Sequence, residues 1–252
     1  MGHYTNLTDP RTELEVVRDW NGVEQVVLRS PRGAYARVSL HGGQVLSWRN
    51  DRGEELLFTS SKAVFKPPKA MRGGIPICFP QFGNSGTLEQ HGFARNRIWA
   101  LDEEHPPLYQ NDNNSKSSVD LILKPLEDDL KCWPHCFEYR LRVSLSKDGD
   151  LSLVSRVRNV NGKPFSFSFG YHTYLSVSDI SEVRIEGLET LDYLDNLSQR
   201  ERFTEQGDAI TFESEVKNVS TVICAVPFDL LMLAECMKLI PFACQVLDFP
   251  SV

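Results

Sequence analysis

Residues 137–159, FEYRLRVSLSKDGDLSLVSRVRN, carry the clearest structural pattern in this 252-residue chain. Hydrophobic residues alternate with polar ones on both sides of Asp148-Gly149, a dipeptide that favours tight turns. Because alternate side chains of a strand lie on opposite faces, this period predicts an antiparallel hairpin with one buried face and one polar face.

Shorter runs of the same kind precede the hairpin and are separated by Pro or Gly-Gly. They are residues 22–30 (GVEQVVLRS), 34–40 (AYARVSL) and 44–48 (QVLSW). Residues 105–118 are polar and rich in Pro, Asn and Ser, which predicts a solvent loop. We find no internal repeat and no linker, so the expectation for residues 1–252 is one domain, a large antiparallel β-sandwich.

Net charge and cysteine spacing limit which partners, cellular compartment and cofactors we expect for this protein. A net charge of −7 and a pI near 5.4 argue against nucleic acid or an anionic membrane as the main partner. The polar start MGHYTNLTDP and six irregularly spaced cysteines predict a cytoplasmic protein with reduced thiols. Cys132, His135 and Cys136 lack a second ligand pair, and no phosphate-binding glycine loop is present, so we expect neither a metal nor a cofactor. The expected oligomeric state is a monomer.

Residues 71–97, MRGGIPICFPQFGNSGTLEQHGFARNR, concentrate positive charge in this acidic chain. Arg72, Arg95 and Arg97 accompany His91 on a stretch rich in Gly and Pro. A guanidinium group can form two parallel hydrogen bonds to the oxygens of one carboxylate or phosphate, and an imidazole can transfer protons near neutral pH. Turn formation alone would also explain the glycines, but with the arginines we favour a loop that binds a small, anionic, polyhydroxyl ligand.

Residues 165–175, FSFSFGYHTYL, alternate between two kinds of side chain. Phenylalanines and Tyr171 share one face, which suits a core, whereas Ser166, Ser168 and Gly170 leave space on the other face in front of His172. A plain strand with a solvent-facing side would give the same alternation. The position of His172 at the end of the small-residue face favours a functional interpretation.

These motifs together resemble a known family. Arg72-Gly73-Gly74-Ile75-Pro76 with a later Phe-Pro step, residues 91–95 (HGFAR) and residues 170–175 (GYHTYL) are similar to the glucose-6-phosphate 1-epimerase branch of the aldose 1-epimerase (mutarotase) family, over residues 20–216. The resemblance implies a galactose mutarotase-like β-sandwich. It also implies an isomerase that interconverts the α and β anomers of glucose 6-phosphate, without metal or organic cofactor.

The resemblance assigns roles to individual residues. His172 corresponds to the general acid at the ring oxygen, and Arg72, Gln90 and Arg95 to substrate contacts, with the arginines suited to phosphate. His91 corresponds to a further sugar contact, and Asp195 to an aspartate that holds sugar hydroxyls.

Residues 217–252 do not match the family pattern, in which a glutamate near the C-terminus is the general base. We therefore expect a truncated or alternatively spliced form without the last strands, in which 230–240 (LLMLAECMKLI) could form a helix and Glu235 is a poor match to the base. Two alternatives to an active mutarotase stay open: a catalytically impaired sugar-phosphate-binding relative, and a non-enzymatic carbohydrate-binding sandwich.

Overall fold

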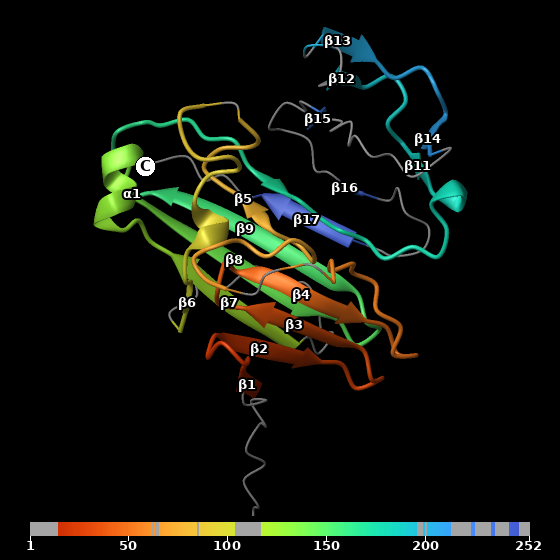
Figure 1. Ribbon diagram of the computed structural model, residues 1–252, viewed down its shortest axis with the longest axis horizontal. Helices are drawn as coiled ribbons and strands as arrows, with labels where there is room; N and C mark the ends of the chain where they lie inside the picture. The colour runs from red at the N-terminus through yellow and green to blue at the C-terminus, as the bar shows by residue number, and fades with distance from the viewer. Residues whose placement is uncertain are drawn as a thin grey trace, which may run out of the picture.

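The computed structural model describes residues 15–61, 63, 66–84, 86–103, 117–195, 199 and 201–212, and the backbone of three short strands at 223–224, 233–234 and 242–246. Four N-terminal strands form an antiparallel sheet in chain order (Figure 1): β1 (Glu15–Arg18), β2 (Glu24–Arg29), β3 (Tyr35–Ser39) and β4 (Gln44–Arg49). The three strand runs expected at 22–48 are therefore confirmed.

The predicted hairpin is the centre of the second sheet. It consists of β8 (Phe137–Leu145) and β9 (Leu151–Asn159), which pair antiparallel along their whole length. Gly149 adopts φ +93° in the connecting turn, a conformation that glycine reaches without steric cost. The sheet order is β16-β17-β9-β8-β7-β6, with β6 (Ala100–Leu101), β7 (Ser117–Leu123), β16 (Leu233–Ala234) and β17 (Phe242–Val246).

The two sheets pack face to face through β2 and β3 against β7 and β8. The odd-numbered residues of the hairpin form the core side, so that Tyr139, Leu141 and Val143 are fully buried. Trp48 of β4 crosses the interface and donates from Nε1 to the carbonyl of Gly149 at 2.9 Å. The β-sandwich predicted from alternation is thus confirmed. The same period of two identifies the hairpin residues that face the core.

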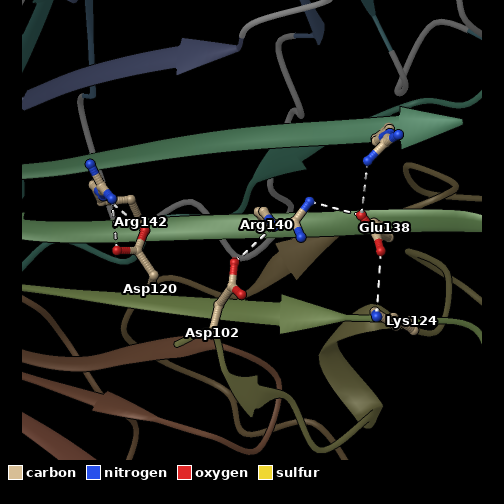
Figure 2. A network of polar contacts seen from close by, with 7 residues as sticks. Asp102, Asp120, Lys124, Glu138, Arg140 and Arg142 are labelled. Atoms are coloured by element: carbon tan, nitrogen blue, oxygen red, sulfur yellow. Dashed lines mark hydrogen bonds and ion pairs between the residues drawn. The ribbon is translucent and has the colours of Figure 1, made fainter. Parts of the chain in front are cut away.

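Ion pairs cover the outward face of the second sheet, as Figure 2 shows. Arg142 binds Asp120 through two 2.8 Å hydrogen bonds, and Arg140 bridges Asp102 and Glu138 at 2.8 Å each. These side chains occupy the polar positions of the alternation. Their carbon stems and paired charges cover part of this face of the sheet.

Smaller elements connect the sheets. They are β5 (Ile77–Cys78), the 3-10 helices η1 (Ala94–Asn96) and η2 (Ile180–Glu182), helix α1 (Glu127–Cys132), β10 (Gly170–Tyr171), β11 (Arg184–Glu186), β12 (Asp192–Asp195), β13 (Glu201–Thr204), β14 (Ala209–Thr211) and β15 (Ile223–Cys224). Strands β5 and β10 pair with each other, β11 pairs with β14, and β12 pairs with β13 and β15. No helix in the described ranges has the length and hydrophobicity needed to cross a bilayer.

The C-terminal strands differ from the sequence expectation. Leu233–Ala234 is a strand paired with β17, so the suggested helix at 230–240 is wrong at these residues. Strand β17 runs parallel to β9, unlike the other paired strands described here. A short apolar run fits a buried strand as well as a helix, and periodicity does not separate the two. The predicted loop at 105–118 lies outside the described residues except for Ser117 and Ser118, which begin β7.

Candidate functional site

Two sequence motifs, one at 72–80 and one at 168–175, lie side by side as neighbouring extended segments. Their regular pairing is short, Gly170 with Cys78 and Tyr171 with Ile77, but hydrogen bonds continue it in both directions. Backbone N–H groups of residues 168, 172 and 174 donate to the carbonyls of residues 80, 76 and 74 at 2.8–3.0 Å. Residues 76 and 80 are prolines and return no hydrogen bond, which explains why the regular strand is shorter than the predicted one.

The alternation in residues 165–175 is confirmed on both faces. The side chains of Phe165, Phe167, Phe169 and Tyr171 pack against the core. On the opposite face the hydroxyl oxygen of Ser168 accepts from the Phe82 N–H at 2.7 Å. A Cβ on Gly170 would lie 2.9 Å from the Phe82 ring, so the small residue is needed for this close approach. His172 follows on the same face.

A strained turn presents His91. His91 has φ +67°, in the left-handed region that is costly for a residue with a Cβ, and Gly92 follows with φ +69°. The backbone carbonyl of Phe79 accepts from Ala94 at 3.1 Å, and the Phe79 N–H donates to the His91 carbonyl at 3.2 Å. The buried Gln81 side chain holds the preceding loop through the carbonyls of residues 83 and 88 and the N–H of residue 88, at 3.0–3.2 Å. Hydrogen bonds from Phe79 and from the Gln81 side chain thus fix this turn.

The hydrogen bonds of His91 define its tautomer. Its Nδ1 accepts from the Gly83 N–H at 3.1 Å and lies 3.2 Å from the Cys78 thiol. Burial, with the nearby charges of Arg95 and His172, lowers the pKa of His91 to about 4, so the ring is neutral at physiological pH. Because Nδ1 accepts from Gly83, it carries no proton of its own. Burial raises the pKa of the neighbouring Cys78 thiol to about 12, so the sulfur beside Nδ1 is protonated. The remaining proton is then on Nε2, and the ring is a hydrogen-bond donor at that atom.

His172 lies against His91 on the neighbouring segment. The two rings meet edge to face with centroids 5.3 Å apart, and the Tyr174 ring stacks on His172 at 4.9 Å. Burial lowers the pKa of His172 and the charge of Arg95 lowers it further, while a hydrogen bond to its own backbone partly offsets both. Burial also raises the pKa of Tyr174, against the opposing effects of Arg72 and Arg95. The free site therefore holds neutral rings beside positive charge.

Arg72 and Arg95 supply that charge without carboxylate partners. Neither forms an ion pair within the described residues. Arg95 donates from Nη2 to the Gln90 carbonyl at 2.6 Å, and its Nε is buried with no hydrogen-bond partner in the described part of the chain. Arg72 is exposed, and its charge acts on Tyr174. Within the part of the chain that the structure describes, two guanidinium groups without carboxylate partners thus act on neutral rings, Arg95 on the histidines and Arg72 on Tyr174, which suits an anion.

The remaining predicted residues fall in different places. Gln90 is exposed next to His91 and meets the cluster through its backbone carbonyl. Asp195 is the last residue of β12, and the description there covers the backbone only, so its role stays a prediction. Glu235 lies outside the described residues.

Arg97 has a structural partner. Its Nε lies 3.0 Å and its Nη2 2.5 Å from Oδ1 of Asp129, whose side chain is almost fully buried. The other oxygen of Asp129 accepts from the Leu126 N–H at 2.9 Å at the start of α1. Of the arginines noted in residues 71–97, Arg97 therefore anchors α1, and it is not available as a partner-free cation.

Cys78 and Tyr174 complete the cluster, and sequence reasoning gave them no role. Tyr174 follows His172 by two residues, so alternation puts both on one face of the strand, a signal that would have justified including it. Cys78 gave no such signal, because its contact with His91 depends on a turn thirteen residues later. The described residues contain no group of three or more His, Cys, Asp or Glu arranged to hold a metal ion.

Comparison with known proteins places the chain in a family. The family described as "Aldose 1-epimerase" matches residues 24–233. A protein of Cenchrus ciliaris named "Putative glucose-6-phosphate 1-epimerase" is 66% identical over 212 residues, which are 83% of this chain and 64% of that protein. A protein of Salmonella typhimurium with the same name is 32% identical over 173 residues, 68% of this chain and 54% of that protein.

Solved structures agree with this assignment. A crystal structure described as a "putative mutarotase" from Salmonella typhimurium has a TM-score of 0.64 at 28% identity and covers 79% of this chain and 67% of its own. A galactose mutarotase-like protein from Lactobacillus casei, at 18% identity, shares the fold with a TM-score of 0.58, over 75% of this chain and 67% of its own. The chain spans 64% and 54% of the lengths of the two relatives matched by sequence. It belongs to the aldose 1-epimerase family, the family that its motifs resemble.

Proposed function

We propose that this chain binds a hexose 6-phosphate and interconverts its α and β anomers, with glucose 6-phosphate as the substrate. The observation that carries the proposal is that Arg72 and Arg95 have no carboxylate partner within the described residues, while Arg95 acts on the neutral rings of His91 and His172 and Arg72 acts on Tyr174. A phosphate dianion would supply the missing negative charge. The relatives named as glucose-6-phosphate 1-epimerases support the same substrate.

The reaction requires an acid and a base on opposite sides of the hemiacetal. A base removes the proton of the C1 hydroxyl while an acid protonates the ring oxygen; the C1–O5 bond breaks, the aldehyde turns about C1–C2, and the ring closes on its other face. We assign His172 as the acid. His91, as a neutral donor at Nε2, and Gln90 would hydrogen-bond sugar hydroxyls, and Asp195 would hold further hydroxyls.

Substrate binding would prepare His172 for this role. In the free protein the pKa of His172 lies below its usual value because of burial and the charge of Arg95. A bound phosphate dianion would offset the charge of Arg95 and raise the pKa of His172 toward neutrality. The protonated imidazole would then be more populated in the complex than in the free protein, which is when an acid is needed.

The general base lies outside these assignments. No carboxylate is described in contact with His91, His172 or Tyr174 among the residues that the structure covers. A catalytically impaired sugar-phosphate-binding protein is therefore the second candidate, because acid–base assistance contributes about 10²- to 10⁴-fold per group. Binding without anomer exchange would identify this candidate.

Exchange NMR on glucose 6-phosphate separates the candidates. We expect the chain to accelerate α–β exchange above the uncatalysed rate and His172→Gln to reduce that acceleration by about 10²-fold or more. Arg72→Ala should weaken binding of glucose 6-phosphate, measured by calorimetry, and leave glucose binding unchanged. Arg32→Ala is the matched control, because Arg32 lies between β2 and β3 and forms an exposed ion pair with Asp148 of the β8–β9 turn. Equal affinity for glucose and glucose 6-phosphate would instead indicate a non-enzymatic carbohydrate-binding protein.

A further inference from the structure

Gln44 is a buried glutamine whose side chain reaches the turn that carries Arg72. It lies in β4 with 1% of its surface exposed. Its Nε2 donates to the carbonyl of Met71 at 3.2 Å and to the carbonyl of Gly73 at 2.6 Å. These carbonyls belong to the residues on either side of Arg72. One amide group therefore holds both ends of the backbone unit that presents the arginine.

The turn has further backbone support but no other described side chain that binds both carbonyls. The Gly74 N–H donates to the Phe58 carbonyl and the Ile75 N–H to the Val45 carbonyl, each at 2.9 Å. These bonds fix the chain after Gly73. Without Gln44, the buried carbonyls of Met71 and Gly73 would lose the side-chain donor described for them. Because a buried carbonyl without a hydrogen bond is unfavourable, we expect the backbone around Arg72 to rearrange.

From this geometry we infer that Gln44 is a positioning residue that sets the direction of Arg72 and so determines the preference of the site for phosphorylated sugars. The inference rests on the proposed function for its ligand, but its structural part does not. Gln44 lies on β4 behind the turn and does not need to touch substrate. It would act by limiting the directions in which the exposed guanidinium can point.

A matched control lies two strands away in the same row of the sheet. Gln25 pairs with Ser39, which pairs with Gln44, and Gln25 is likewise buried, with 4% exposed. Its amide has a 3.4 Å contact with Asp19 and none described with the Arg72 turn. Gln25→Met therefore removes a buried amide at an equivalent depth without removing the bonds beside Arg72.

Trypsin tests the structural part without substrate. It cleaves after arginine, and cleavage between Arg72 and Gly73 requires this turn to open, so mass spectrometry of the fragment ending at Arg72 measures opening. We expect Gln44→Met to increase this cleavage about 5- to 30-fold over wild type, and Gln25→Met to leave it near the wild-type rate. Equal rates for the two variants would overturn the inference. If Gln44→Met does not fold, Gln44→Asn, which keeps an amide but is one methylene shorter, is tested in its place.

Calorimetry tests the specificity part. Gln44→Met should lower affinity for glucose 6-phosphate about 5- to 30-fold and change affinity for glucose by less than about twofold, since Arg72 is expected to contact the phosphate. In the Arg72→Ala background the same substitution should have no further effect. Equal weakening for both sugars, or an additive effect in that background, would refute the positioning role. If wild type binds neither sugar, the proposed function fails, and the trypsin result alone decides whether Gln44 fixes the turn.

Discussion

Replacing Gly74 by alanine should destabilise the protein much more than the same change at Gly83. The two residues have nearly the same backbone angle, φ +59° and φ +60°. At Gly83 a new Cβ would meet no atom within 4 Å, whereas at Gly74 it would lie 2.1 Å from the carbonyl oxygen of Val45. The difference between the two variants therefore measures the close approach alone, because the cost of the left-handed angle is common to both.

The magnitudes follow from these contacts. The left-handed conformation costs an alanine about 1–2 kcal/mol, partly offset by the smaller entropy of the unfolded chain, so Gly83→Ala should lose about 1 kcal/mol. Gly74→Ala must in addition displace β4, where Val45 is fully buried and accepts from the Ile75 N–H at 2.9 Å. Overpacking and strain on that hydrogen bond add about 2–4 kcal/mol.

Urea unfolding followed by tryptophan fluorescence is the measurement, since Trp48 and Trp99 are buried in the core. With a denaturant slope of about 2 kcal/mol/M, the midpoint should fall by about 0.5 M for Gly83→Ala and by about 1.5–2.5 M for Gly74→Ala. The Gly74 carbonyl also accepts from the Tyr174 N–H at 2.8 Å, so the second variant should lose sugar-phosphate affinity as well. Equal midpoints for the two variants would refute the argument from close approach.

Three further outcomes follow from the same structure. Asp129→Ala should lower the free energy of unfolding by about 3 kcal/mol, because it leaves Arg97 without its partner and α1 without its N-terminal acceptor. Asp128→Ala, on the exposed side of the same helix, should change that free energy by less than about 0.5 kcal/mol. Comparable losses for the two variants in urea unfolding would contradict this. NMR titration should give His172 a pKa below 6.5, and Arg95→Gln should raise it because the charge of Arg95 lowers it; an unchanged titration would argue against their proximity. The folded state keeps His91 neutral, because its pKa is lowered from 6.5 to about 4. Its contribution to stability is therefore complete above pH 6.5 and is lost as the pH falls toward 4. Between pH 7 and 5 the wild type should lose stability faster than His91→Gln, and parallel stability curves would count against the lowered pKa.

Much of the fold could be predicted from alternation alone. The hairpin at 137–159 and the strand runs between residues 22 and 48 contain the residues that pack together, so a local period of two identifies both the strands and their buried faces. The same period placed the aromatic face of residues 165–171 on the core and His172 on the opposite face. These features depend on side-chain direction within one strand, and that direction is a local property.

Only part of the candidate site could be predicted from neighbouring residues in this way. The sequence gathered Arg72, His91, Arg95 and Arg97 within one segment, but residue type and spacing did not show that Arg97 has a buried partner, Asp129, 32 residues later. Nor did it indicate that the Gly83 N–H and the Cys78 thiol both lie against Nδ1 of His91. Ion pairing and burial depend on which distant segments meet, and residue spacing carries no record of them.

Residue types and their period by themselves determined that this chain forms a β-sandwich and that its arginine-rich and histidine-bearing motifs belong to one family. Tertiary structure alone decided that those motifs lie as adjacent segments, that Gln44 holds the carbonyls on both sides of Arg72, and that Arg72 and Arg95 lack carboxylate partners within the described residues while Arg97 does not. The physical reason is that strand formation follows from the side chains of neighbouring residues. The hydrogen bonds and charges of a site are instead completed by groups that only folding brings together.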